Sequence, residues 1–330
     1  MPTSLPPFGR TAVAMVTPFR HDGALDPDGA QQLATHLVDR QGCDGLVVGG
    51  TTGESATTTD AEKGTVLRAV LEAVGDRCAV TAGVGSNDTR HTVELARAAE
   101  RAGAHGLLVV TPYYNLPTQE GIRRHLTTVA DATALPVMLY DVPARTGTAL
   151  TRETLLRLAG HPRITAVKDA AGDLTKSSAV LAATDLLYYS GADELNLPLT
   201  AIGATGMVST VGNAAGLAVA AVPAALAAGR PTEAAHLHQR LLPLVEAMMG
   251  SGAPGTVTAK ALLRHQGLPA GPVRLPLVDA DQRLTDTLVS ALEAVLESSR
   301  EAGRGPAPRT APSSPAPAAA EAAATATARS

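Results

Sequence analysis

The chain has 330 residues, and its 27 basic and 31 acidic side chains give a net charge of −4. A composition of 45% apolar and 18% charged residues is typical of a globular protein and argues against overall disorder. No basic excess is available to neutralise phosphates, and two cysteines make neither a disulfide framework nor a zinc site, so we expect no nucleic-acid partner and no metal.

The start of the chain has no charged head followed by an apolar run, so the sequence predicts no signal peptide. The longest apolar stretch, residues 214–228, falls short of the roughly 20 apolar residues that a membrane helix needs. We therefore expect a cytoplasmic protein with no membrane partner.

Short apolar runs that end in Gly, Pro, Asp or Thr recur along the chain and predict buried parallel strands. They are Thr11–Thr17, Gly45–Gly50, Cys78–Gly85, Gly106–Pro112, Pro136–Pro143, Ile164–Ala170, Leu186–Gly191 and Gly206–Thr210. Helix patterns separate these runs: Asp26 precedes Pro27 as an N-cap, and Thr59 with Glu62 forms a capping box. Eight strand–helix units favour a (β/α)8 TIM barrel over an open doubly wound sheet, which would need a glycine-rich phosphate turn after its first strand.

The composition divides the chain into three parts. Residues 1–212 hold the barrel strands, and residues 213–300 the last barrel helix and a C-terminal helical appendage. The appendage is indicated by helix patterns at Glu233–Met249, Val257–Gln266 and Gln282–Ser299. Residues 301–330 are rich in Ala and Pro and contain almost no large apolar side chain, so the sequence predicts a disordered tail.

A TIM barrel places its active site at the carboxyl ends of the strands, and Lys168 lies late in the sixth predicted strand. Burial inside a barrel disfavours the charged ammonium, and a free amine can condense with a ketone to an iminium. From the strand context alone, Lys168 is either such a nucleophile or a strand-end lysine that reaches water.

Other polar residues follow neighbouring strands. Tyr140 is either a proton-transfer group or a packed aromatic, and Thr51 and Thr52 lie in a glycine-rich loop that either holds a carboxylate or makes a tight turn. Arg145 either binds a carboxylate or is solvated. His236 and His238 are two residues apart on a predicted helix and point in different directions, which argues against a metal pair.

Four motifs at these strand ends resemble the dihydrodipicolinate synthase/N-acetylneuraminate lyase family, most closely its synthase branch. They are G-T-T-G-E-S at 50–55, T-P-Y-Y-N at 111–115, Y-x-V-P-x-R-T-G at 140–147 and V-K-D-A at 167–170. The resemblance runs in order from about residue 8 to residue 295. It implies a Schiff-base lyase in lysine and diaminopimelate biosynthesis that condenses pyruvate with L-aspartate 4-semialdehyde, as a homotetramer with no cofactor.

The resemblance also implies roles for individual residues. Lys168 matches the Schiff-base lysine and Tyr140 the general acid/base, with Thr51 as the hydroxyl that joins the proton relay. Tyr114 matches a relay tyrosine that reaches into the neighbouring subunit's site. The matches to substrate-binding positions are Thr52, Val208, Gly191 and, for the carboxylate of the aldehyde, Arg145.

Two positions depart from the family pattern. Asp141 stands where many members have Asn, and Asp169 where many have Glu, so we expect an altered but still polar or acidic group near the site. In lysine-inhibited members a histidine and a glutamate bind lysine, whereas this chain offers Asp60 and Lys63 on the first helix concerned and His91 in place of the glutamate. A like charge and a lost anionic partner predict weak or absent inhibition by lysine.

Three alternatives remain open on the sequence. The same scaffold serves lyases and aldolases that act on a sialic acid or a 2-keto-3-deoxy sugar acid. A non-catalytic ligand-binding barrel is a second alternative, against which the retained Lys168, Tyr140 and Thr51 argue. A metal-dependent aldolase is the third, although no cluster of His and carboxylates falls at the predicted strand ends.

Overall fold

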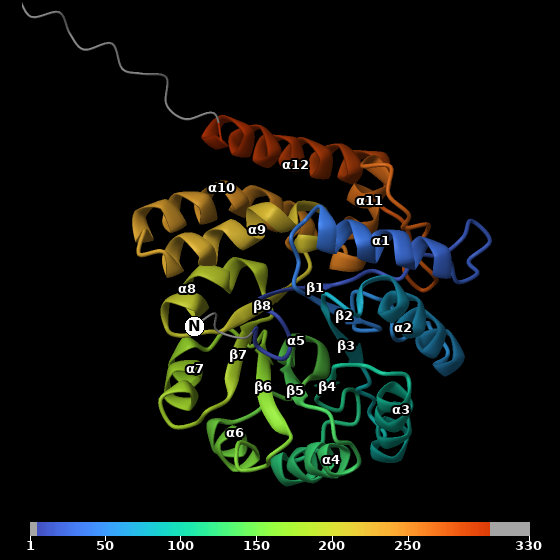
Figure 1. Ribbon diagram of the computed structural model, residues 1–330, viewed down its shortest axis with the longest axis vertical. Helices are drawn as coiled ribbons and strands as arrows, with labels where there is room; N and C mark the ends of the chain where they lie inside the picture. The colour runs from blue at the N-terminus through green and yellow to red at the C-terminus, as the bar shows by residue number, and fades with distance from the viewer. Residues whose placement is uncertain (1–4, 304–330) are drawn as a thin grey trace, which may run out of the picture.

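The computed structural model describes residues 5–303, and within them eight parallel strands close a barrel in sequence order, β1 pairing with both β2 and β8 (Figure 1). The strands are β1 (Thr11–Ala14), β2 (Gly45–Val48), β3 (Ala79–Gly83), β4 (Gly106–Val110), β5 (Val137–Asp141), β6 (Ile164–Asp169), β7 (Leu187–Ser190) and β8 (Gly206–Ser209). Each begins within one residue of its predicted start, so the predicted (β/α)8 barrel is confirmed. The predicted strands run one to three residues too far because loop residues continue the apolar pattern.

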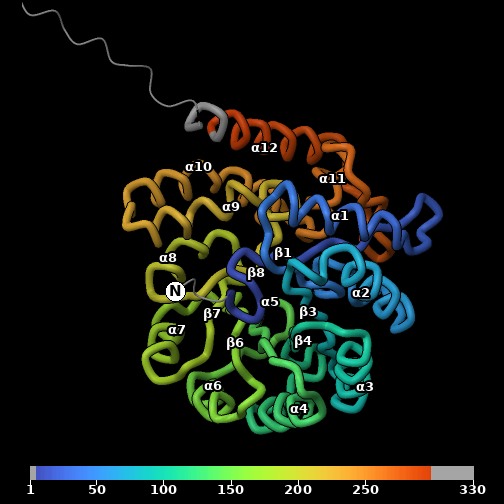
Figure 2. The backbone as a smooth tube through the Cα atoms, viewed as in Figure 1, coloured from blue at the N-terminus to red at the C-terminus, as the bar shows by residue number. Residues whose placement is uncertain are grey.

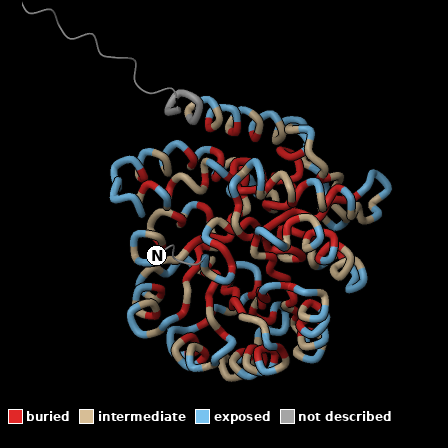
Figure 3. Tube along the Cα trace, in the orientation of Figure 1, coloured by how far each residue is buried: buried red, intermediate tan, exposed pale blue. Residues whose placement is uncertain are grey.

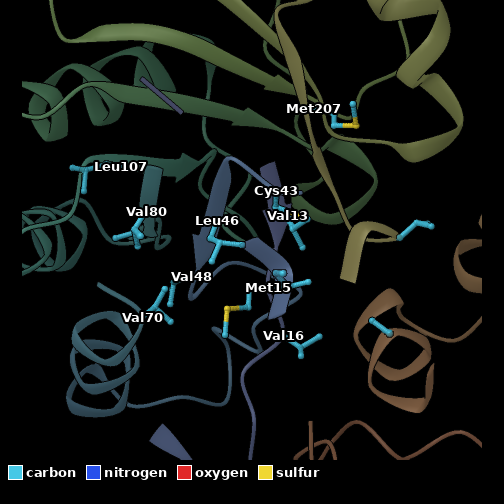
Figure 4. Packing of buried hydrophobic residues seen from close by; sticks show 14 of the residues in the cluster. Val13, Met15, Val16, Cys43, Leu46, Val48, Val70, Val80, Leu107 and Met207 are labelled. Atoms are coloured by element: carbon cyan, nitrogen blue, oxygen red, sulfur yellow. The ribbon is translucent and has the colours of Figure 1, made fainter. Parts of the chain in front are cut away.

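Successive side chains of a strand point to opposite faces, and this alternation builds two cores. Outward residues such as Val13, Leu46 and Val48 pack against the surrounding helices, with Val70 of a helix beside them (Figure 4). Inward residues fill the barrel: Ala12, Ala14, Val47, Leu108, Met138, Tyr140, Ala166, Tyr189 and Val208. Burial is concentrated along the strands and on the inner sides of the helices (Figure 3).

Helices surround the barrel. The first part of the chain gives α1 (Pro27–Asp39), α2 (Asp60–Val74), α3 (Thr89–Arg101), α4 (Gln119–Asp131), α5 (Pro143–Thr146), α6 (Arg152–Leu158), α7 (Leu174–Leu181) and α8 (Asn196–Ala201). The predicted starts of α1 and α2 are confirmed: Asp26 caps Gly29, and Thr59 and Glu62 form both bonds of the capping box. These caps fix where each loop at the carboxyl end of a strand gives way to helix.

After β8 the chain continues as α9 (Gly212–Ala227), α10 (Pro231–Met249), α11 (Gly255–His265) and α12 (Gln282–Gly303). These helices gather on one side of the barrel beside α1, with α12 outermost (Figures 1 and 2). The three predicted C-terminal helices are thus present, each with an end displaced by a few residues. The predicted disordered tail begins at residue 301, whereas α12 continues to Gly303; residues 304–330 lie outside the described part of the chain. No helix among the described residues is long and apolar enough to cross a membrane.

Candidate active site

Lys168 and Tyr140 lie side by side near the carboxyl ends of β6 and β5. The two residues are register partners, and Lys168 Nζ lies 4.2 Å from the centre of the Tyr140 ring. Lys168 is only 5% exposed and Tyr140 only 6%, since both point into the barrel. The pair thus brings together an amine, which can act as a nucleophile, and a phenol, which can transfer protons.

Gly191, the residue after β7, leaves the space that the Lys168 side chain occupies. A Cβ added there would lie 3.0 Å from Lys168 Cγ and 3.1 Å from both Ala170 Cβ and the Asp169 carbonyl oxygen. The Gly191 N–H also donates to the Asp169 carbonyl at 2.7 Å, which holds the two strand ends together. The glycine is therefore required by close approach to Lys168.

The glycine-rich loop after β2 places Thr52 next to the end of β8. Thr52 is 8% exposed, and its hydroxyl lies 3.4 Å from the Thr210 hydroxyl, whereas Thr51 is exposed at the mouth of the barrel. Val208 on β8 points into the barrel and is buried. The structure thus brings the predicted pyruvate-binding residues of β2 and β8 to the same end of the barrel as Lys168.

Asp193 fixes the end of β8, a role that the sequence analysis missed. Its carboxylate accepts hydrogen bonds from the Ser209 hydroxyl and from the backbone N–H groups of Thr210 and Val211, both at 3.0 Å. Asp193 is 3% exposed, so this carboxylate is held by the protein rather than by water. An aspartate just after a buried barrel strand was the only sequence signal for it.

Arg145 lies on α5, a single helical turn after β5. The turn closes at Gly147, whose φ of +77° is the left-handed conformation that glycine adopts without a steric penalty. The Thr146 hydroxyl ties the turn from inside by donating to the carbonyl oxygens of Val142 and Thr148. Arg145 itself is exposed to solvent.

Asp141 and Asp169 face away from Lys168, because each is one residue beyond an inward-pointing side chain. Asp141 accepts from Leu150 N–H and pairs with Lys176 Nζ at 2.7 Å, and Lys176 also donates to the Leu150 carbonyl. Burial raises the pKa of Asp141, while the hydrogen bond from Lys176 opposes that rise. Asp169 accepts from the Ala171 N–H and from the Ser177 hydroxyl. The two residues that depart from the family pattern therefore anchor the loops at 142–150 and 170–177 and do not face Lys168.

Tyr114 is 90% exposed and has a φ of +72°, so it is not packed against Lys168 within the subunit. Leu116, with a φ of +45°, is 60% exposed on the same loop, and Tyr113 is 38% exposed. Exposed aromatic and aliphatic side chains on a strained loop are typical of a contact surface.

Within residues 5–303, no group of three or more His, Cys, Asp or Glu side chains is placed to hold a metal ion.

Comparison with known proteins matches nearly the whole described chain. The model of the dihydrodipicolinate synthetase family matches residues 7–295. The 4-hydroxy-tetrahydrodipicolinate synthase 1 of Streptomyces coelicolor is 60% identical over 301 residues, covering 91% of this chain and 97% of that protein. A lysine-bound DHDPS from Cyanidioschyzon merolae is similar in structure, with 40% identity, a TM-score of 0.85 and coverage of 88% and 98%. The pyruvate complex of the chloride-inhibited dihydrodipicolinate synthase from Acinetobacter baumannii is also similar, with 35% identity and a TM-score of 0.82. The match covers 87% of this chain and 98% of that protein.

Proposed function

The chain belongs to the dihydrodipicolinate synthetase family, and we propose that it condenses pyruvate with L-aspartate 4-semialdehyde through a Schiff base on Lys168. The family and the synthase class predicted from the sequence are confirmed by the family model and by relatives that carry this enzyme name at 57–60% identity. The observation that carries the chemistry is the buried pair of Lys168 and Tyr140 at the carboxyl end of the barrel.

The first half of the reaction forms an enamine. The unprotonated Lys168 amine attacks C2 of pyruvate, and loss of water from the carbinolamine leaves an iminium. The iminium draws electrons from the methyl group, which loses a proton to give the enamine. In this proposal the Tyr140 hydroxyl takes part in both proton transfers, and the contact of its ring with Lys168 Nζ supports the assignment. The hydroxyl of Thr51 and a Tyr114 from a neighbouring subunit complete the proposed relay to solvent.

The second half builds the ring. The enamine carbon attacks the aldehyde carbon of the second substrate, and the new alkoxide takes up a proton. The amine of that substrate then attacks the iminium carbon and displaces Lys168, which closes the six-membered ring and frees the enzyme. Arg145 binds the carboxylate of the aldehyde through its planar guanidinium, which matches a carboxylate with two parallel hydrogen bonds.

Pyruvate is held by the loops after β2, β7 and β8 in this proposal. Thr52 and Val208 contact its carboxylate through hydroxyl and backbone groups, and Gly191 leaves room for the Lys168 side chain that bonds to it. The anchoring of β8 by Asp193 keeps these donors in place before substrate arrives.

We further propose a homotetramer in the cytoplasm, where pyruvate and an amino-acid aldehyde are available. The exposed apolar loop around Tyr114 supports a subunit contact there. Analytical ultracentrifugation of wild type and Tyr114→Asp tests it, since a charge in the contact is expected to shift the protein to smaller species.

Steady-state kinetics test the choice of aldehyde. At a fixed pyruvate concentration, kcat/KM for aspartate semialdehyde is expected to exceed kcat/KM for sugar aldehydes. Arg145 can pair with the carboxylate of aspartate semialdehyde, whereas a sugar aldehyde has no carboxylate for it to bind. A higher kcat/KM for a sugar aldehyde would assign the chain to the sugar-acid branch of the same scaffold.

A further inference from the structure

We propose that Lys260, on α11 in the C-terminal helical region, is a positioning residue for the loop that carries Thr51 and Thr52, and that it acts through Glu54. This inference rests on the proposed function, because it gives that loop a part in proton transfer. Lys260 lies outside the barrel, and its ammonium contacts Glu54, Pro272 and Phe19.

The contact between Lys260 and Glu54 is completely buried. Lys260 Nζ lies 2.6 Å from Glu54 Oε1, with the two side chains 0% and 1% exposed. The ammonium also donates to the Pro272 carbonyl at 2.8 Å and lies 4.2 Å from the centre of the Phe19 ring. The other carboxylate oxygen, Glu54 Oε2, accepts from the Arg274 N–H at 2.9 Å. Both oxygens of Glu54 are therefore held by the C-terminal region, more than 200 residues along the chain.

Glu54 adopts a backbone conformation that side chains other than glycine seldom take. Its φ is +56°, and a residue held there needs surroundings that compensate for the strain. The Glu54 N–H donates to the Thr51 carbonyl at 3.1 Å, so the conformation of one residue fixes the other. A buried carboxylate without a cation is strongly disfavoured, which makes the ion pair the interaction that selects this loop conformation.

A second contact from α11 reaches the same loop. The Thr256 hydroxyl donates to the Thr51 carbonyl at 3.4 Å, one turn of helix before Lys260. On the barrel side, the Thr17 hydroxyl donates to the Gly53 carbonyl at 2.7 Å. The segment from Thr51 to Glu54 is thus held between the loop after β1 and α11, and loosening one side displaces the Thr51 hydroxyl. A misplacement of about 1 Å lowers a catalysed rate by up to about a hundredfold.

The charge state of Lys260 depends on its partner. Burial lowers the pKa of Lys260 to about 8, and the carboxylates of Glu54 and Asp279 oppose that fall while Arg264 adds to it. A purely structural ion pair predicts only a loss of folded protein when it is broken. A positioning role predicts that molecules that remain folded form the pyruvate adduct but move protons slowly.

The experiment compares two quantities in the intact chain at saturating pyruvate. One is the fraction of Lys168 trapped by borohydride, measured by mass, and the other is the rate at which the pyruvate methyl exchanges protons for deuterium, measured by NMR. The exchange rate divided by the trapped fraction reports proton transfer per adduct. The variants are Lys260→Met and Glu54→Gln, and the matched control is Arg230→Met. Arg230 precedes α10 in the same C-terminal region but pairs with Glu233 at the surface.

We expect both variants to form the adduct, with exchange per adduct at least about tenfold below wild type, and the control to match wild type. Glu54→Gln keeps the size of the side chain and decides the question if Lys260→Met does not fold. Exchange per adduct within about twofold of wild type in either folded variant would overturn the inference. A wild-type protein that borohydride does not label would instead overturn the proposed function.

Discussion

Lys168 and Tyr140 are partners in the register of β6 and β5, so the contact between their side chains is fixed by the backbone of two central strands. Hydrogen bonds to neighbouring strands on both sides of β5 and β6 hold this register. Both side chains are therefore carried by rigid strands and not by a loop. In the proposed mechanism these two residues are the nucleophile and the proton donor, and both are in place before pyruvate binds, which reduces the cost of reaching the transition state. The loops supply the remaining groups and can vary with the second substrate.

Gly191→Ala should slow adduct formation, because its new Cβ meets Lys168 Cγ at 3.0 Å and displaces the lysine side chain. Overpacking of this kind destabilises a protein by about 1–3 kcal/mol, so the variant is expected to fold. The rate of borohydride trapping with pyruvate measures the effect. Gly121→Ala on α4 is the control, since its Cβ would meet nothing closer than 3.4 Å. Equal trapping rates in wild type and Gly191→Ala would show that this space is not needed.

Arg145→Ala should lower kcat/KM for aspartate semialdehyde while leaving the pyruvate adduct intact. A charge-assisted hydrogen bond to a carboxylate is worth about 1.5–3 kcal/mol, which corresponds to a loss of about ten- to a hundredfold. Steady-state kinetics and trapping, measured on the same preparation, separate the two steps. Arg152→Ala removes another exposed cation, from the start of α6, and should change neither. An unchanged kcat/KM in Arg145→Ala would remove Arg145 from the site.

Free L-lysine should inhibit this enzyme weakly or not at all. Asp60, the acidic residue on α2 in this region, is already engaged by the chain's own side chains: His91 Nε2 lies 2.8 Å from Oδ2 and Lys63 Nζ lies 3.7 Å from Oδ1. The hydrogen bond from His91 lowers the pKa of Asp60, so its charge is present but shared. An activity titration at saturating pyruvate measures inhibition. Half-inhibition below about 1 mM, where binding is worth roughly 4 kcal/mol, would contradict the prediction.

His125 should make the protein sensitive to mild acid. Burial lowers its pKa from 6.5 to about 4, with Asp88 opposing the shift, and its Nδ1 lies 2.9 Å from the Thr89 hydroxyl. Between pH 6.5 and 4 the unfolded chain binds a proton at this residue and the folded chain does not, so the free energy of unfolding falls as the pH falls.

The shift corresponds to about 3 kcal/mol at pH 4. Urea unfolding between pH 7 and 4 should show a smaller loss of stability for His125→Gln than for wild type, by up to this amount. His21→Gln changes an exposed histidine and serves as the control. Parallel pH profiles for wild type and His125→Gln would rule out His125 as the cause.

Local patterns in the sequence were sufficient to predict the fold. Each strand is a short apolar run flanked by turn residues, and the caps at Asp26 and Thr59 involve residues only three apart. The closure of the barrel follows once eight such units are counted. Helix ends and strand ends were less well predicted, because the apolar pattern continues for a few residues into the loops.

The interactions that hold the site in place could not be predicted in the same way. Asp141 pairs with Lys176 across 35 residues and Glu54 with Lys260 across more than 200, so no spacing in the sequence marks either pair. The positions of Asp141 and Asp169 illustrate the limit. Resemblance placed them near the site, while only the register of β5 and β6 shows that they face the helices and anchor loops.

The role of Lys168 as the nucleophile is tested most directly by the mass of the protein after incubation with pyruvate and borohydride. We expect one reduced pyruvate unit per chain, located on Lys168 by peptide mapping, and no label on Lys168→Ala. Lys168→Arg should also remain unlabelled, because a guanidinium stays protonated and cannot form the iminium. Labelling of Lys168→Ala to the same extent as wild type would contradict the assignment of Lys168 as the nucleophile.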